Sequence, residues 1–119
     1  MEPVKDLSKK HCVPCEGGVP PLSREDAQPY LAQVPRWEIS EDGKRISRTW
    51  SCKDFRAACA FVNAVAEIAE REQHHPDIHL ENYRRVRIDL STHAIHGLSE
   101  NDFILAAKIE DIAEAQGTV

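Results

Sequence analysis

Apolar residues recur along the chain with two periods, about 3.6 residues in some stretches and two in others. The longest helical stretch runs from about Asp54 to Glu72, and its apolar positions are Phe55, Cys59, Val62, Val65 and Ala69. Phe61 and Ile68 widen the apolar side of this helix beyond what one sheet face covers. We therefore expect part of it to be buried against a second copy of the chain, in a homodimer or homotetramer.

Shorter helices are predicted on both sides of this one. Ser23 is a suitable N-cap for the first, and Pro35 follows its end. Ser99, with Asp102 three residues later, resembles a capping box that opens the last helix. The apolar stripe of that last helix consists of Leu105, Ile109 and Ile112.

Strands are predicted where apolar and polar residues alternate. The stretch RWEISEDGKRISRTW favours a hairpin, with Trp37 and Ile39 before an Asp-Gly turn and Ile46 and Trp50 in phase after it. In IHLENYRRVRIDLSTH, the alternating apolar residues of two further strands are Ile78, Leu80, Val86, Ile88 and Leu90. The predicted fold class is α+β: a four-stranded antiparallel sheet with helices packed on one face, in the order α-β-β-α-β-β-α.

The first part of the chain lacks both periods. Its segment EGGVPPL carries Gly-Gly and Pro-Pro breakers. We expect an irregular N-terminal arm over residues 1–22 and a single domain over residues 23–119, since 119 residues suffice for one hydrophobic core.

Composition and charge exclude several classes of protein. The chain is 41% hydrophobic and 29% charged, and its net charge is −5, which argues against nucleic-acid binding. The one dense basic cluster, Arg84, Arg85 and Arg87, falls in a predicted strand and is interpreted as a solvated face. No stretch approaches the ~20 apolar residues of a membrane span, and the N-terminus has no apolar signal sequence, so a cytoplasmic location is expected.

Four cysteines raise the question of a metal site. Cys12 and Cys15 form CVPC, and Cys52 and Cys59 are the available second pair. In one helix, cysteines seven residues apart are separated by roughly 10 Å, whereas two zinc-bound sulfurs lie within about 4 Å. We expect reduced cysteines and no metal.

Adjacent histidines stand out in the stretch AEREQHHPDIHLENY. In isolation, His74 and His75 are typical of a helix C-terminus, where the dipole favours cations. A zinc site from His74, His79 and His93 is disfavoured because the chain has no H-E-x-x-H helix and Pro76 interrupts any helical turn after His75.

A longer pattern extends around this pair: a carboxylate, His-His-Pro, an aromatic, a histidine and an aspartate. Its members are Glu70, His74, His75, Pro76, Tyr83, His93 and Asp102. Together with LSTH and GLSEND, this pattern resembles the pterin-4a-carbinolamine dehydratases, and the family's order of elements is the one predicted above. The CVPCEGG arm is absent from the animal enzymes, so the chain resembles microbial and plant members.

The resemblance implies dehydration of a 4a-hydroxytetrahydropterin to a quinonoid dihydropterin, without a cofactor. His74 and His93 correspond to the principal acid–base pair, which suits histidine because its ordinary pKa lies near neutral pH. His75 is implied to be a catalytic residue that holds and orients the pterin and can partly substitute for the pair. The implied substrate-binding residues are Glu70 near the pterin ring, Trp37 along the pocket, and Asp102. Asp102 is expected to orient His93 or to stabilise its protonated form.

The family also has members of another class. The implied physiological context is recycling of the cofactor of aromatic amino acid hydroxylases, such as phenylalanine hydroxylase. The alternative is a non-catalytic binding or assembly module, or a transcriptional coactivator, on the same fold. The complete set of histidines favours the enzyme, while the physiological pterin stays open.

Overall fold

The computed structural model describes residues 7–13 and 19–118. Its elements are η1 (Leu7–Lys9), α1 (Arg24–Leu31), β1 (Glu38–Ile39), β2 (Ile46–Ser51), α2 (Phe55–Glu72), β3 (Asp77–Glu81), β4 (Arg85–Leu90), η2 (His93–Ile95) and α3 (Glu100–Ala115). The strands form one antiparallel sheet in the order β1-β2-β4-β3. This confirms the predicted α+β class and the order of its main elements.

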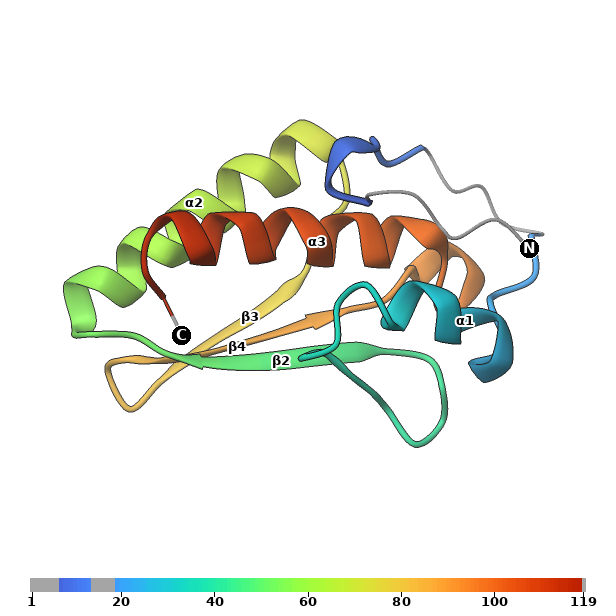
Figure 1. Cartoon of the computed structure of the whole chain (residues 1–119), viewed down its shortest axis with the longest axis horizontal. Coiled ribbons are helices and arrows are strands. Elements are labelled where there is room, and N and C mark those ends of the chain that lie inside the picture. Colours follow the sequence, from blue (N-terminus) through green and yellow to red (C-terminus); the bar gives the residue numbers. More distant parts are fainter. Residues whose placement is uncertain (1–6, 14–18, 119) are drawn as a thin grey trace.

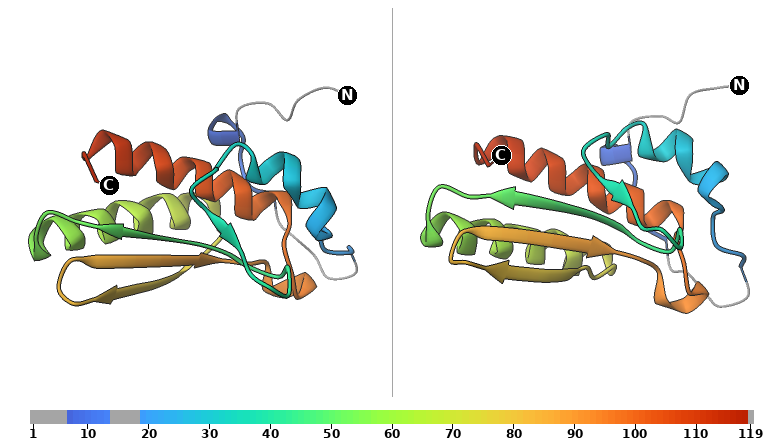
Figure 2. Two further views of the ribbon diagram at one scale, coloured as in Figure 1. Left: turned by 60° about the horizontal axis from the view of Figure 1, so that its bottom comes forward. Right: turned by 90° about the horizontal axis from the view of Figure 1, so that it is seen from below.

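Two long helices cover one face of the sheet. In Figure 1, α2 and α3 lie above the strands, and α1 packs near the start of α3. The further views keep α2 and α3 on the same side of the sheet (Figure 2). The strand residues that face these helices are Ile46, Trp50, Val86, Ile88 and Leu90, and all of them are buried. The alternation in the sequence therefore identified the inner face correctly.

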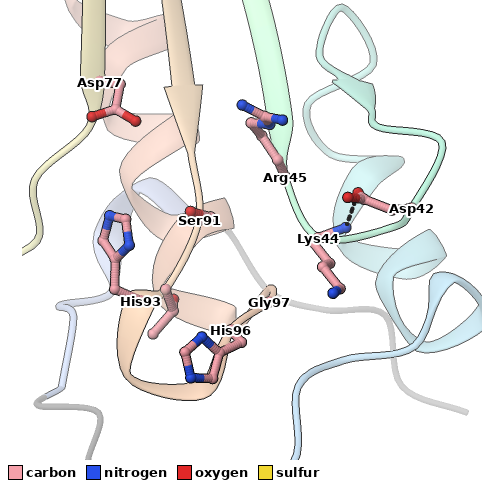
Figure 3. Close-up of a pocket in the computed structure, with 9 residues that line it drawn as sticks. Asp42, Lys44, Arg45, Asp77, Ser91, His93, His96 and Gly97 are labelled. Carbon is pink, nitrogen blue, oxygen red and sulfur yellow. Dashed lines mark hydrogen bonds between the residues drawn. The ribbon is translucent and has the colours of Figure 1, made fainter.

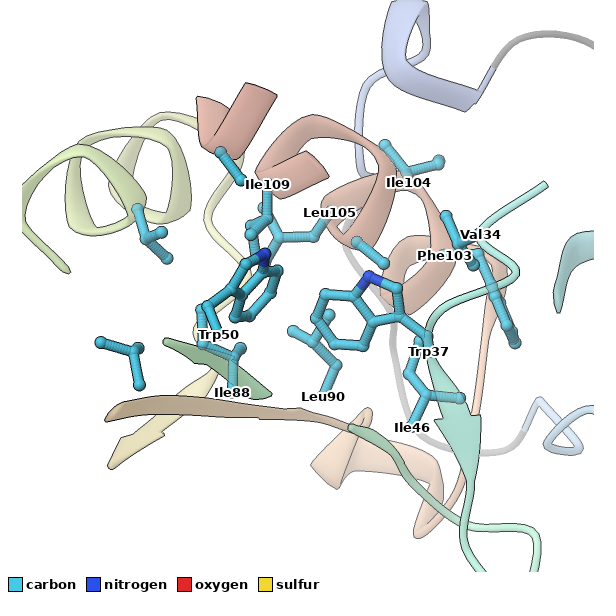
Figure 4. Close-up of a cluster of buried hydrophobic side chains, with 14 of the residues drawn as sticks. Val34, Trp37, Ile46, Trp50, Ile88, Leu90, Phe103, Ile104, Leu105 and Ile109 are labelled. Carbon is cyan, nitrogen blue, oxygen red and sulfur yellow. The ribbon is translucent and has the colours of Figure 1, made fainter. Parts of the chain in front are cut away.

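Aromatic rings fill the core between the sheet and the helices. The Trp50 ring packs edge-to-face with Trp37 at a centroid distance of 5.6 Å (Figure 4) and with Phe61 at 5.0 Å. Such edge-to-face pairs are worth about 0.5–1.5 kcal/mol beyond the area that they bury. Within the described ranges, no helix combines the length and apolar content that a membrane crossing needs.

The ends of α2 follow from its sequence. Asp54 caps the start, where its side chain accepts a hydrogen bond from the Ala57 N–H. Gln73 ends the helix in the left-handed conformation, with φ of 55°. Pro76 then enforces an extended path into β3. His74 and His75 therefore lie in the short connection between α2 and β3.

The loop between β1 and β2 is longer than a two-residue Asp-Gly hairpin. β1 has only two residues, and Gly43 has φ of +73°, within a loop over residues 40–45. Asp42 accepts hydrogen bonds from the Ser40 hydroxyl and the Lys44 N–H, which lower the pKa of its carboxyl. The side chain of Arg24 also donates to the loop carbonyl of Ser40. These side-chain bonds add to the backbone bond from the Ser40 N–H to the Arg45 carbonyl, which closes the loop.

The N-terminal arm is more ordered than the sequence predicted. Leu7 begins a short 3-10 turn and is only 1% exposed, so it belongs to the hydrophobic core. Cys15 lies outside the described residues. The boundary between residues 22 and 23 stays a prediction, because residues 7–13 pack on the domain instead of standing apart from it.

Part of α2 has no cover within the chain. Phe55 is 55% exposed, and Ala66, about three turns further along the same side of α2, is exposed as well. We predict that copies of the chain associate through this side, so multi-angle light scattering at micromolar concentration should give a multiple of 13.4 kDa. Ala66→Glu should shift the mass toward the monomer, whereas Ala115→Glu, at the exposed end of α3, should not. A 13.4 kDa mass for the parent contradicts this prediction.

Candidate active site

Three elements converge where α2 ends, β4 ends and α3 begins. His74 follows the left-handed Gln73, and its backbone N–H donates to the Ala69 carbonyl at 3.2 Å. This bond aims the His74 ring at the start of α3, where its Nε2–H donates to Asp102 Oδ1 at 2.7 Å. Sequence positions 28 residues apart are thereby joined in one histidine–carboxylate pair.

The Asp102 carboxylate has no exposed surface and is surrounded by donors. Its Oδ2 atom accepts from the Thr92 hydroxyl at 2.8 Å and from the Ser99 N–H at 3.0 Å. The Ser99 contact is half of the capping box that the sequence predicted, and the positive end of the α3 dipole adds further stabilisation. The buried charge is therefore compensated by three hydrogen bonds and a helix terminus.

Asp102 also selects the tautomer of His74. Because an ionised carboxylate only accepts hydrogen bonds, it holds the proton of the shared bond on Nε2. In the neutral tautomer, the lone pair then lies on the opposite nitrogen, Nδ1. This arrangement holds a proton acceptor in a fixed orientation, as carboxylate partners do for other catalytic histidines.

His75 forms a second, more exposed pair. Its Nε2–H donates to Glu70 Oε2 at 2.5 Å, across the last turn of α2. The His75 side chain is 57% exposed, so solvent screens this pair and it contributes little to stability. The two adjacent histidines thus have different carboxylate partners, one buried and one at the surface.

His93 lies at the wall of a cavity of about 330 Å³ (Figure 3). The lining residues are Asp42, Lys44, Arg45, Asp77, Ser91, Thr92, His93, His96 and Gly97. Within the part of the chain that the structure describes, the His93 ring makes no hydrogen bond. Thr92 both lines the cavity and donates to Asp102, so it connects the cavity to the His74 pair.

Two site residues differ from expectation. Asp102 was expected to orient His93, but the structure pairs it with His74, because α3 begins beside the exit of α2. With no exposed surface, Asp102 reaches a ligand only through the residues that it contacts, such as His74 and Thr92. Trp37 is 2% exposed in the core, and its indole N–H donates to Glu110 at 2.8 Å. Its contact with substrate stays a prediction.

Thr92 joins the site although the sequence analysis did not single it out, and Ser99, predicted only as a helix cap, joins it as well. Thr92 and Ser99 contact each other through their hydroxyls at 2.7 Å beside Asp102. Their signal was present in the segments LSTH and GLSEND, whose hydroxyl residues flank the turn after β4. Tyr83, by contrast, is exposed in the β3–β4 turn with φ of 51°, where the Arg84 guanidinium lies over its ring. That position fits a structural role for Tyr83.

Residues 20–112 match the family described as Pterin 4 alpha carbinolamine dehydratase. A putative pterin-4-alpha-carbinolamine dehydratase of Nitrosomonas eutropha is 49% identical over 92% of this chain and 96% of the relative. A protein of the same description from Halorhodospira halophila is 49% identical over 87% of this chain and 94% of the relative.

Solved structures share the fold. The transcriptional coactivator/pterin dehydratase from Brucella melitensis aligns with a TM-score of 0.73 and 31% identity, covering 78% of this chain and 98% of that one. A pterin dehydratase-like protein, identified as a RuBisCO assembly factor in the alpha-carboxysome, aligns with a TM-score of 0.56 and 20% identity. That alignment covers 65% of this chain and 88% of the other, and it shows similarity of fold alone.

The Asp102 network predicts a loss of stability on substitution. Asp102→Asn should lower the free energy of unfolding by about 2–4 kcal/mol, because an amide group replaces a charged acceptor that has donors on all sides. Urea unfolding followed by circular dichroism measures the change. Asp111→Asn, on the exposed side of α3, is the matched control and should unfold like the parent. Equal stability of both variants contradicts this account of the network.

The Cys12 thiol should react slowly in the folded protein. Burial raises its pKa to about 12, and the charges of Glu72 and Asp102 add to the effect against Lys108. At pH 8 the thiolate fraction is then far below that of an ordinary cysteine. Iodoacetamide labelling read by peptide mass spectrometry should be at least tenfold slower at Cys12 in buffer than in urea. Equal rates overturn this prediction.

Proposed function

The chain belongs to the pterin 4 alpha carbinolamine dehydratase family, and from this premise we propose that it dehydrates a 4a-hydroxytetrahydropterin by histidine acid–base catalysis. The observation that carries the proposal is the buried Asp102, which accepts the Nε2–H of His74 and so favours the tautomer that has its lone pair on Nδ1. The cavity beside His93 adds a concave space, which is linked to this pair through Thr92.

The reaction moves two protons and expels one water. A general acid protonates the hydroxyl at C4a, the C4a–O bond breaks, and water leaves. A general base takes the proton from N5, and the electron pair of that N–H bond forms the C4a=N5 double bond of the quinonoid dihydropterin. No electron leaves the system, so no redox cofactor is needed. Two correctly placed acid–base groups suffice.

His74 suits the role of the base. Its unprotonated Nδ1 accepts the N5 proton, and the imidazolium that forms is stabilised by the buried Asp102 carboxylate. Because the donors Thr92 and Ser99 hold the carboxylate in place, little reorganisation accompanies the proton transfer. Asp102 is in this proposal a positioning residue that acts through His74.

His93 supplies the second proton transfer, from the wall of the cavity. Its ring makes no hydrogen bond among the described residues and is exposed, so it can exchange protons with solvent between turnovers. His75, held by Glu70, orients the pterin at the rim of the site. The expected role of Glu70 near the pterin ring is then indirect, through His75.

The physiological role follows from the product. A quinonoid dihydropterin is a substrate for reduction, so the reaction returns a tetrahydropterin cofactor to use. We place the protein in the recycling of the cofactor of aromatic amino acid hydroxylases, including phenylalanine hydroxylase, in the cytoplasm. No metal or other cofactor is part of this proposal.

A binding role is the second candidate. The Brucella melitensis structure at 31% identity is described both as a transcriptional coactivator and as a pterin dehydratase. A binding module has no need of the His74–Asp102 pair, so substitutions there separate the two functions.

Steady-state kinetics on chemically generated carbinolamine tests the proposal. His74→Ala and His93→Ala should each lower kcat by about 10²–10⁴, the usual contribution of a general acid or base. The double variant should lose far less than the product of the two single losses, because the two histidines act in one step. His75→Ala should mainly raise KM, since an orienting contact acts equally on bound substrate and transition state.

His79→Ala is the control for these variants. His79 lies on β3 and pairs with Asp89 at 3.2 Å on the far face of the sheet, so its loss should leave kcat and KM near the parental values. Circular dichroism confirms folding of each variant. A folded His74/His93 double variant with parental kcat rules out the mechanism and favours the binding role.

A further inference from the structure

Residues 7–13 lie along the end of α2 and the start of α3, and we refer to them as the strap. Figure 1 shows this blue segment beside the C-terminal turn of α2 and above the first turns of α3. The family match begins at residue 20, so the strap lies outside it. The sequence interpretation gave this segment no function.

Adjacent strap residues bind the two helices. The Cys12 N–H donates to Glu72 Oε1 at 2.7 Å, at the end of α2. Val13 exchanges two hydrogen bonds with the Asn101 side chain in α3: its N–H donates to Oδ1 at 3.0 Å, and its carbonyl accepts from Nδ2 at 2.6 Å. Since consecutive Cα atoms are about 3.8 Å apart, these bonds fix the α2 end close to the α3 start.

The two anchoring side chains flank the His74–Asp102 pair. Glu72 precedes His74 by two residues, and Asn101 directly precedes Asp102. The strap therefore spans the same two elements as the 2.7 Å hydrogen bond between the ring and the carboxylate. Any movement of one element relative to the other changes both contacts.

The strap is fixed at its other end as well. Leu7 is buried in the core, and Lys108 of α3 donates to the Ser8 carbonyl at 2.8 Å. His11 donates to Glu72 Oε2 at 2.9 Å, and Lys108 lies 3.9 Å from the same oxygen. The strap is thus anchored by the buried Leu7 at one end, and His11 and Cys12 donate hydrogen bonds to Glu72 near the other.

Glu72 is buried and depends on these partners. Burial by itself raises the pKa of its carboxyl, but the hydrogen bonds from His11 and Cys12 and the charge of Lys108 outweigh burial, so the pKa is lowered overall. Two of these three partners belong to the strap. The strap therefore supplies most of the polar contacts of Glu72 at the end of α2.

We propose that the strap positions His74 against Asp102 for proton transfer, with Val13, Asn101 and Glu72 as positioning residues. The proposal rests on the dehydratase function above. Misplacement of a reacting group by about 1 Å can cost 10²-fold in rate. Loss of the strap contacts that hold His74 against Asp102 should therefore lower kcat. The strap residues are not proposed to contact substrate, so KM should change little.

Backbone and side-chain variants test the role of the strap. Val13→Pro deletes the N–H that donates to Asn101, whereas Val13→Ala keeps it and removes only an exposed side chain. Asn101→Ala removes both bonds from the other side. Lys10→Ala is the control for Asn101→Ala. Lys10 also lies in the strap, but its exposed ion pair with Glu100 of α3 is not one of the hydrogen bonds made by Cys12 and Val13.

The expected result is a fall in kcat of roughly 10- to 100-fold for Val13→Pro and Asn101→Ala, with KM within twofold. Val13→Ala and Lys10→Ala should stay within twofold of the parent in both constants. If circular dichroism shows that Val13→Pro does not fold, Asn101→Ala decides. Parental kcat in folded Val13→Pro and Asn101→Ala overturns the proposal.

A second measurement needs no substrate. The downfield proton resonance of His74 Nε2–H, assigned by its absence from His74→Gln, reports the bond to Asp102. It should persist in Val13→Ala and Lys10→Ala, and it should broaden or vanish in Val13→Pro and Asn101→Ala as water gains access. An unchanged resonance overturns the strap proposal even where kcat falls. If the parent protein shows the resonance but no turnover, the proposed function is wrong. The resonance of the variants then still decides whether the strap positions His74 against Asp102.

Discussion

A carboxylate without access to water, that of Asp102, imposes the constraint on which the candidate site depends. Removing such a charge from water costs several kcal/mol, which is offset only where donors surround it. The donors come from three separate places: His74 after α2, Thr92 after β4 and Ser99 before α3. Folding must bring all three within hydrogen-bonding distance, so the site is assembled by the same event that buries the charge.

The rest of the fold holds these three segments in place. α3 carries Asp102 in its first turn and then contributes Phe103, Ile104 and Leu105 to the core. The inner face of the sheet meets this helix from below, and α2 lies beside it. The apolar packing of α3 therefore determines how deeply Asp102 is buried. Stability and acid–base geometry cannot be altered independently at this point.

Much of this arrangement could be predicted from the sequence. The bounds of α2 followed from its period and from Pro76, and the capping box followed from the spacing of Ser99 and Asp102. The partner of Asp102 could not be predicted, because a spacing does not say which of two motif histidines approaches across 28 residues. The docking of residues 7–13 also escaped prediction, since backbone N–H groups make several of its contacts and every residue except proline has one.

The capping box gives Asp102 a second use that does not depend on chemistry. A relative that lost its acid–base histidines would still need a carboxylate at this position to begin α3, because the Ser99 N–H and the Thr92 hydroxyl would still require an acceptor. Selection for folding alone would therefore preserve the aspartate in inactive descendants. Under the proposed mechanism, its retention among related sequences would therefore be a poor marker of activity, and loss of His74 would be the better sign of an inactive member.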